Sequence, residues 1–191
     1  MSEDLATGTD YDVLARLVQD KWRVFEFGSF MGGSALAMLR TMPKDSRLYC
    51  IDHFLGNRDD PCTAVPRREM LDNFLRRTEP YWSMLTIIVG GTEEAIMFPR
   101  HCADMCFIDA SHDYEAVAHD IACAKHLVRI GGIICGHDYI KHYEDCDPEL
   151  IKKYSESPDG GFEGVSYGVI RAVHEAFGKP EHEGAVWWVK V

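Results

Sequence analysis

Three features are missing from this 191-residue sequence: a long apolar run, an excess of basic residues and an apolar leader at its start. Its apolar runs are shorter than the roughly 18 residues that a membrane span needs, so no membrane partner is expected. The chain has 20 basic and 31 acidic residues. The resulting net charge of −11 disfavours nucleic acid and anionic membranes, which attract basic surfaces. The first ten residues are polar and acidic, unlike a secretory signal.

Repeats, low-complexity segments and interdomain linkers are also absent from the sequence. The length suits one domain with a substantial core, and we expect a single domain over residues 1–191. The seven cysteines are an odd number, and Cys50, Cys106 and Cys135 lie in segments that are predicted to be buried strands. This favours reduced thiols, and hence a cytoplasmic protein, over a disulfide framework.

Short apolar segments alternate with amphipathic ones along most of the chain. Strands are predicted at residues 23–27, 47–51, 85–89, 105–108, 133–135 (after a Gly131-Gly132 turn) and 185–191, and helices at 11–22, 34–40, 114–127 and 166–177. This alternation of helices with continuously apolar strands predicts an α/β fold on a parallel sheet. Two insertions interrupt it: residues 56–80, with a short helix near 67–77, and the long loop 141–164. Loops of this length often bind ligands, so both are expected to border a binding pocket.

The most informative segment is FEFGSFMGGS, at residues 25–34. A short strand that contains Glu26 ends in a glycine-rich turn, and Ser34 then opens a helix. This order is typical of the place where a parallel sheet binds a nucleotide-like cofactor. The glycine spacing differs from G-x-G-x-x-G, and Glu26 would repel a pyrophosphate. An acid here favours a positively charged cofactor such as S-adenosylmethionine, which carries a sulfonium and an amine but no phosphate.

Polar or acidic residues close several of the predicted strands: Glu26, Asp52, Asp109 and the pair His137-Asp138. Parallel α/β sheets bind ligands at the carboxyl ends of their strands, so these side chains should converge on one crevice. Asp52 can accept hydrogen bonds from both hydroxyls of a ribose. That role would serve NAD and S-adenosylmethionine equally well.

Taken together, these segments resemble the class I S-adenosylmethionine-dependent methyltransferases. The closest similarity is to the small sugar and natural-product O-methyltransferase group, with its macrocin O-methyltransferase and cephalosporin-hydroxylase-like relatives. The matching segments are residues 25–34, YCIDHF at 49–54, FIDASHDYE at 107–115, GGIICGHDY at 131–139, 168–173 and 187–190. The resemblance implies a Rossmann-like three-layer sandwich with a mostly parallel seven-stranded sheet whose last strand is antiparallel. It also implies methyl transfer from S-adenosylmethionine to a hydroxyl of a small molecule.

The resemblance assigns a cofactor-binding role to residues after the first four strands. Glu26 would act near the methionine amine, either directly or through a water molecule. Asp52 would hold the ribose, and His53 or Phe54 would cover the adenine. Thr92 is expected either to contact the adenine edge or to cap the helix that follows it. The full expected set is Glu26, Gly28, Ser29, Gly32, Ser34, Asp52, His53, Phe54, Thr92, Glu93 and Asp109.

The resemblance also implies a divalent cation, because related O-methyltransferases often bind one with an acid after strand four and an acidic pair after strand five. Asp109 and Asp138 match two of those positions, and His137 occupies the third. Imidazole in place of a carboxylate shifts the preference from Mg²⁺ toward softer ions such as Mn²⁺. An acid that some relatives carry as the base is Ser111 here, so His112 or His137 would take the proton. The alternative is that the same acids line a metal-free crevice.

Two other functions remain open at this level: an NAD-dependent oxidoreductase, and a non-catalytic module that binds S-adenosylmethionine or a partner protein. A homo-oligomer that closes the site with a neighbouring subunit is also left open. The first insertion is locally basic. Its arginines are expected to form a solvated helix face, with binding of an acidic substrate group as the alternative. These arginines are Arg58, Arg67, Arg68, Arg76 and Arg77.

Overall fold

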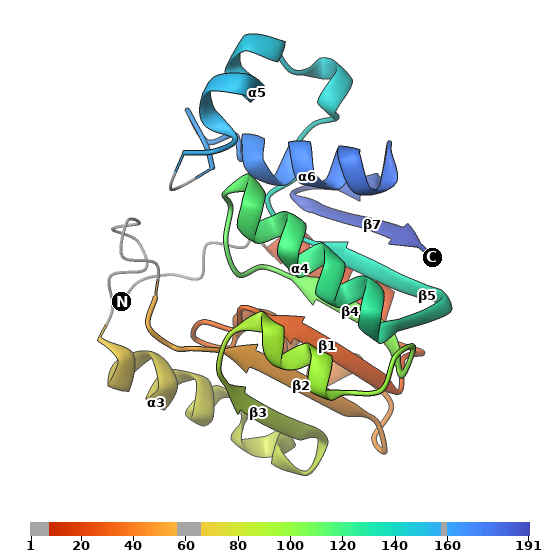
Figure 1. The fold of residues 1–191 in the computed structure, drawn as a ribbon. Coiled ribbons are helices and arrows are strands. Elements are labelled where there is room, and N and C mark those ends of the chain that lie inside the picture. The colour runs from red at the N-terminus through yellow and green to blue at the C-terminus, as the bar shows by residue number, and fades with distance from the viewer. Residues whose placement is uncertain (1–7, 57–65, 158–159) are drawn as a thin grey trace.

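The computed structural model describes residues 8–56, 66–157 and 160–191. A seven-stranded sheet with the order β3-β2-β1-β4-β5-β7-β6 forms its centre (Figure 1). Within it β7 runs antiparallel to both neighbours, and the other strands are parallel to one another. The predicted sheet, mostly parallel with an antiparallel last strand, is confirmed. The strands are β1 (Arg23–Phe27), β2 (Arg47–Asp52), β3 (Leu85–Val89), β4 (Ala103–Ile108), β5 (Val128–Gly136), β6 (Glu181–Glu183) and β7 (Val186–Lys190).

Helices cover both faces of the sheet and create two separate apolar cores. One core packs beneath α1 (Gly8–Val18), α2 (Gly33–Thr41) and α3 (Arg67–Thr78), and the other beneath α4 (Tyr114–Leu127) and α6 (Tyr167–Phe177). Alternation along β1 feeds both cores, because Val24 packs in the first and Phe25 and Phe27 in the second. The remaining elements are α5 (Pro148–Tyr154) and the 3₁₀ helices η2 (Glu79–Met84), η3 (Thr92–Met97) and η4 (Tyr143–Asp145).

Several predicted boundaries were wrong. The first helix ends at Val18 rather than at Trp22, whose side chain is exposed. The Gly131-Gly132 pair lies inside β5, where the pairing with β4 changes register, so it is not a turn before the strand. The predicted helix near residues 67–77 is confirmed as α3.

The second insertion is not the continuous loop that was predicted, because it contains η4 and α5. Asp147 caps α5 by accepting a hydrogen bond from the Glu149 amide, and Pro148 occupies the first turn. Both are ordinary helix-start signals. In Figure 1, α5 lies beyond α6 and away from the strand ends of the parallel sheet.

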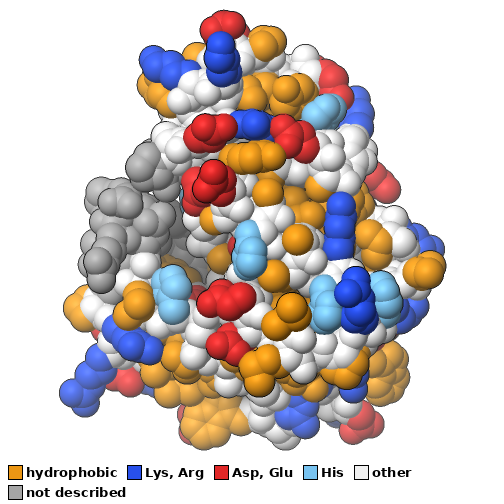
Figure 2. Space-filling view, viewed as in Figure 1, with side chains coloured by type: hydrophobic (Ala, Val, Ile, Leu, Met, Phe, Trp, Pro, Cys, Tyr) orange, Lys and Arg blue, Asp and Glu red, His pale blue; other side chains and the backbone are white. Residues whose placement is uncertain are grey.

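The described cysteines are six free thiols, in agreement with the reduced state that was expected. Among the described residues, no helix combines the length and the apolar character needed to cross a membrane. On the face shown in Figure 2, acidic, basic and histidine side chains are interspersed with apolar ones.

Candidate functional site

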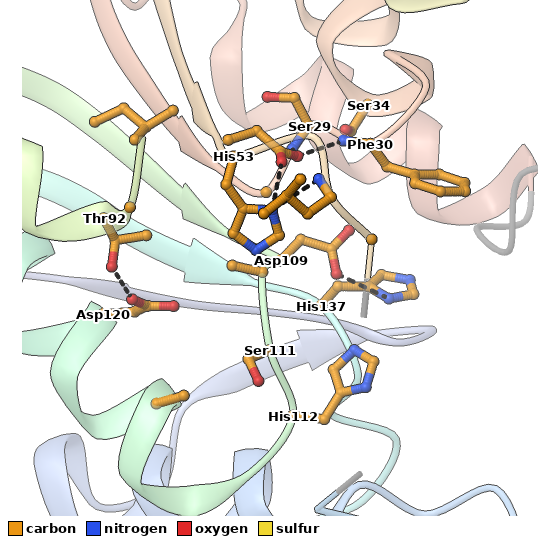
Figure 3. Close-up of a pocket in the computed structure, with 18 of the residues that line it drawn as sticks. Ser29, Phe30, Ser34, His53, Thr92, Asp109, Ser111, His112, Asp120 and His137 are labelled. Atoms are coloured by element: carbon orange, nitrogen blue, oxygen red, sulfur yellow. Dashed lines mark hydrogen bonds and ion pairs between the residues drawn. The ribbon is translucent and has the colours of Figure 1, made fainter. Parts of the chain in front are cut away.

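A cavity of about 770 Å³ opens at the carboxyl ends of β1, β2, β4 and β5, where the strand-end acids were predicted to converge (Figure 3). All but three of the predicted site residues line it. Those that line it are Gly28, Ser29, Ser34, Asp52, His53, Thr92, Glu93, Asp109, His112, His137 and Asp138. Glu26, Gly32 and Phe54 do not.

The turn at Gly28 ties together the ends of three strands. Gly28 has φ +81°, and a Cβ built there would lie 2.2 Å from the Asp109 carbonyl oxygen. The Gly28 amide donates to the Ile51 carbonyl at 3.0 Å, and the Asp109 amide donates to the Phe27 carbonyl at 2.8 Å. Only glycine combines this dihedral with so close a backbone approach. The turn therefore fixes the distance between Asp52, after β2, and Asp109, after β4.

Glu26 requires a correction, because its carboxylate is fully buried and does not face the cavity. The side-chain period of β1 directs it toward α2, where it accepts hydrogen bonds from the hydroxyls of Ser29 and Ser34, both at 2.5 Å. The Cys50 thiol donates to it at 3.0 Å. Burial raises the pKa of Glu26 to about 7, although these bonds oppose the rise. Glu26 thus pins both ends of the glycine-rich turn and does not meet a ligand directly.

Asp52 lines the cavity but is already engaged by backbone amides. Its Oδ2 accepts from Ser29 and Phe30 at 2.7 and 2.8 Å, and its Oδ1 accepts from Phe54 at 2.6 Å. An ionised carboxylate accepts about four hydrogen bonds. One acceptor position therefore remains on Oδ1, so a two-oxygen grip on a ribose is not available in this arrangement.

The two residues expected to cover an adenine, His53 and Phe54, point in different directions. His53 lines the cavity with a half-exposed side chain. Phe54 has φ +52°, and its ring is buried in the core, edge-on to Phe74 at a centroid distance of 5.4 Å. The positive φ turns Phe54 away from the cavity, which corrects the prediction that it could cover a ligand there.

After β3, Thr92 and Glu93 line the cavity, but Thr92 is not a helix cap. The N-cap of η3 is Gly91, and no side chain caps it. The Thr92 hydroxyl donates instead to Asp120 of α4, at 2.5 Å. Asp120 also lines the cavity and was not predicted.

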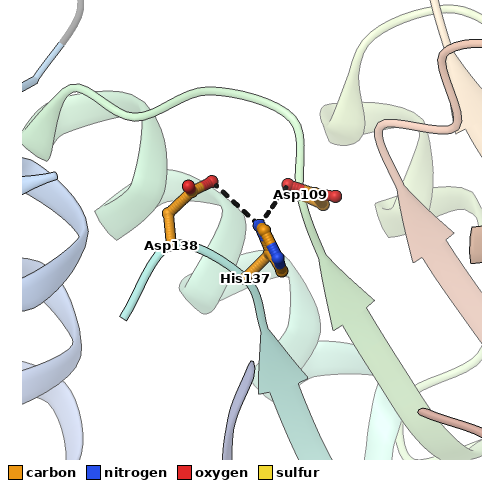
Figure 4. A group of neighbouring side chains, drawn as sticks. All are labelled: Asp109, His137 and Asp138. Carbon is orange, nitrogen blue, oxygen red and sulfur yellow. Dashed lines mark ion pairs between the residues drawn. The ribbon is translucent and has the colours of Figure 1, made fainter. Parts of the chain in front are cut away.

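The second predicted group surrounds His137 (Figure 4), which lies across the cavity from Thr92 and Asp120 (Figure 3). Nδ1 of His137 lies 3.4 Å from Asp138 Oδ2 and 4.0 Å from Asp109 Oδ1. On the far side of the ring, Nε2 lies 3.6 Å from Oδ2 of Asp10, near the start of α1. His112 Nε2 completes the group at 2.9 Å from Asp138 Oδ2. Asp10 was missed from the sequence because it comes to the site by a long-range contact.

The electrostatics of this group favour a positive charge between the acids. Burial raises the pKa of Asp109 to about 6, and the neighbouring His137 opposes the rise. Burial would lower the pKa of His137, but the Asp138 hydrogen bond and the charges of Asp109 and Asp10 raise it to about 9. Burial is likewise outweighed at Asp138, where bonds from His112 and His137 hold the pKa well below its usual range.

The donor set fits a divalent cation. Asp109, His137 and Asp138 each offer one ligand atom, and these atoms lie within 4.8 Å of one another. Two carboxylates and an imidazole suit Mn²⁺ and similar ions better than Mg²⁺, which prefers oxygen. Asp138 also adopts φ +64°, an uncommon conformation that aims its carboxylate back at both histidines. A proton on His137 and a metal ion are thus alternative ways to balance the same acids.

The insertions contribute less to the cavity than was expected. From the first insertion, Gly56 and Met70 of α3 line it, together with Leu55 just before the insertion. None of the described residues of the second insertion does. Arg58 lies outside the described residues, and Arg68 is exposed near Asp72, at 3.8 Å. Arg67, Arg68 and Arg76 are exposed on α3, which agrees with the expected solvated helix face, and no described arginine of this insertion lines the cavity.

Comparisons with known proteins agree with this architecture. A family model described as a methyltransferase domain matches residues 25–139, more than half of the chain. A search of the curated proteins finds no match. Solved structures with a similar fold include an O-methyltransferase from Bacillus cereus in complex with SAH, with a TM-score of 0.67 and 17% identity over 97% of this chain and 82% of that one.

Two further structures have a comparable likeness. The O-methyltransferase TomG from Streptomyces achromogenes, involved in tomaymycin synthesis and in complex with SAM, has a TM-score of 0.63 and 16% identity over 96% of this chain and 79% of that one. Cofactor-bound Rv0187 from MTB has a TM-score of 0.65 and 19% identity over 97% and 81%. At these identities the likeness establishes a shared fold.

Proposed function

The chain belongs to the methyltransferase-domain family, and from this premise we propose that it transfers the methyl group of S-adenosylmethionine to a hydroxyl of a small molecule. The observation that carries the proposal is the division of the cavity. The glycine-rich turn and Asp52 form one part, and Asp109, His137 and Asp138 form another. The SAM and SAH complexes of the O-methyltransferases with the same fold support the choice of cofactor.

The first part of the cavity would bind the cofactor. The glycine-rich turn, whose residues Gly28, Ser29 and Ser34 line the cavity, would border the methionine portion. The acceptor position left on Asp52 Oδ1 takes one ribose hydroxyl, and the His53 ring lies over the adenine. Glu26 acts as a positioning residue here, because it fixes the turn through Ser29 and Ser34.

The second part would hold the acceptor hydroxyl. Methyl transfer is an in-line displacement in which the oxygen–methyl bond forms as the sulfur–methyl bond breaks. The acceptor proton passes to His112, whose imidazole is held at 2.9 Å from Asp138. Asp138 orients the ring and stabilises the charge that it gains. Alignment of oxygen, methyl and sulfur supplies on the order of 7 kcal/mol in well-oriented systems.

A divalent cation fits the same part of the cavity, where Asp109, His137 and Asp138 would hold it. When bound, such an ion lowers the pKa of a coordinated hydroxyl and so makes deprotonation easier at neutral pH. His112 is outside this ligand set, since it contacts the site through Asp138. It therefore keeps the role of proton acceptor whether or not the ion is present.

Calorimetry tests the proposal first, with S-adenosylmethionine, S-adenosylhomocysteine and NAD as ligands. We expect both S-adenosyl compounds to bind and NAD to be excluded; binding of NAD alone would contradict the proposal. The second step is an activity screen against catechols, sugars and other hydroxyl acceptors, with and without Mn²⁺. Methyl transfer to one class supports the proposal. Cofactor binding without transfer across the whole panel would instead identify a non-catalytic binding module.

A further inference from the structure

An acidic residue occupies the buried face of α4. Val117, Ile121 and Ala124 of this helix pack into the core, and Asp120 falls on the same side at helical spacing. Asp120 is only 4% exposed. A carboxylate in such a position is costly unless polar partners compensate for the lost water. The burial of the Asp120 carboxylate therefore needs a specific explanation.

One partner of Asp120 belongs to the protein, and a second position is open. The Thr92 hydroxyl donates to Oδ1, and Figure 3 shows the other oxygen directed away from Thr92. Within the described part of the chain, the carboxylate makes no other hydrogen bond, and the residue lines the cavity. Burial raises the pKa of Asp120 to about 6, with the Thr92 bond opposing, so the group is largely ionised at neutral pH. An acceptor oxygen is thus presented to whatever fills this end of the cavity.

The position of Asp120 relative to Asp52 indicates which part of a ligand it meets. The Gly90 amide donates to the Asp52 carbonyl at 3.2 Å, and Thr92 follows two residues later. Asp52, Thr92 and Asp120 therefore succeed one another along one side of the cavity. His137 lies at the other end of the cavity (Figure 3). A ribose at Asp52 would direct its base toward Thr92 and Asp120.

We propose that Asp120 reads the exocyclic amino group of the cofactor's adenine and thereby selects adenine over a 6-oxopurine. The inference rests on the proposed function, since it assumes that an S-adenosyl compound fills the cavity. An ionised carboxylate is an acceptor only, so it pairs with the amino group of adenine. With hypoxanthine it would face a carbonyl oxygen, and both groups would lose their hydrogen bonds. Sites built around one buried polar partner discriminate strongly against ligands that lack its complement.

The test compares S-adenosylhomocysteine with S-inosylhomocysteine, its 6-oxo analogue, by calorimetry on the parent chain and on Asp120→Asn. Asparagine can still accept the Thr92 hydrogen bond, and its amide nitrogen then presents a donor to the base. The parent is expected to bind the adenine compound at least about tenfold more tightly. In Asp120→Asn this preference should disappear or reverse. Glu115→Gln is the matched control, because Glu115 is an exposed acid of the same helix that does not line the cavity, and the change should leave the preference unchanged.

Each outcome tests either the inference about Asp120 or the proposed function. If the parent binds S-adenosylhomocysteine and Asp120→Asn keeps the parental preference, the inference is wrong and the proposed function stands. If the parent binds neither compound, the proposed function itself falls. Thermal melting establishes that the variants fold. Should Asp120→Asn fail to fold, Asp120→Ala replaces it: equal affinity for the two compounds supports the inference, and an undiminished preference for adenine overturns it.

Discussion

Two pairs of acidic residues at the strand ends around the cavity interact with different kinds of partner. At the ends of β1 and β2, Glu26 and Asp52 accept hydrogen bonds from neutral donors: two hydroxyls, a thiol and three backbone amides. After β4 and β5, Asp109 and Asp138 face the imidazoles of His112 and His137 instead. The first pair holds a loop in shape. The second pair faces imidazoles that can carry protons, and in the proposed mechanism it would also hold a metal ion.

The difference teaches that the place of an acid in a parallel sheet does not determine its role. All four acids lie at or next to the carboxyl end of a strand. Their neighbours decide the rest, since neutral donors leave the carboxylate as a fixed acceptor, whereas imidazoles share protons with it. Single substitutions at either pair of acids test this difference.

The largest effect is expected at Asp138. Asp138→Asn keeps a residue that tolerates φ +64° but removes the charge that orients His112. Once an acceptor is known, kcat should fall about a thousandfold. The affinity for S-adenosylhomocysteine should change less than about threefold, because Asp138 is not in the first part of the cavity, which is proposed to bind the cofactor. Calorimetry measures the affinity and initial rates measure kcat. A parallel loss of both would contradict the proposed difference between the two parts of the site.

The next largest effect is expected for Gly28→Ala, because the turn at Gly28 connects the strand ends that carry the two parts of the site. The new Cβ would meet the Asp109 carbonyl at 2.2 Å, in a residue with φ +81°. We expect a loss of about 3 kcal/mol or more in the free energy of unfolding. Gly164→Ala is the control: its φ is +77°, but nothing lies within 4 Å of the new Cβ, so it should lose only about 1 kcal/mol. Equal losses in urea denaturation would show that close approach at Gly28 is unimportant.

Glu26→Gln sharpens the comparison through pH. The pKa of Glu26 is raised by burial from 4.5 to about 7, so the folded chain retains a proton that the unfolded chain has lost. The contribution of Glu26 to the free energy of unfolding is fully favourable below about pH 4.5, and it is lost as the pH rises through about 7. The parent should therefore lose roughly 3 kcal/mol relative to Glu26→Gln between pH 4 and pH 8. Asp109 and Asp120 titrate in both proteins and cancel. Parallel stability curves would contradict this account of Glu26.

The smallest of these effects is expected at Asp52. Asp52→Asn replaces one acceptor oxygen by a donor and leaves amides of the turn without a partner. The ligand-free protein should lose about 2 kcal/mol of stability, and affinity for S-adenosylhomocysteine should fall as well. A residue that only contacts the ribose would show the second effect without the first. Urea denaturation in the absence of ligand distinguishes the two.

The sequence predicted the sheet and the convergence of Asp52, Asp109 and Asp138, because carboxyl ends of parallel strands meet by construction. It could not predict which way two other side chains turn. Glu26 faces α2 rather than the cavity, and Phe54 enters the core through a positive φ. These directions depend on the local backbone and packing partners.

Two site residues were missed for different reasons. Asp10 reaches His137 and the Ala185 amide, 175 positions away along the chain, and no local pattern encodes such a contact. Asp120, in contrast, left a readable sign. It interrupts the apolar face formed by Val117, Ile121 and Ala124, where a charged residue calls for a partner.

A crystal structure of the protein with S-adenosylhomocysteine and Mn²⁺ tests the central claim most directly. The account predicts the adenine beside Thr92 and Asp120, the ribose at Asp52, and the sulfur directed toward the side of the cavity where the ion lies among Asp109, His137 and Asp138. A cofactor bound with its adenine at His137, or one bound outside this cavity, would contradict it.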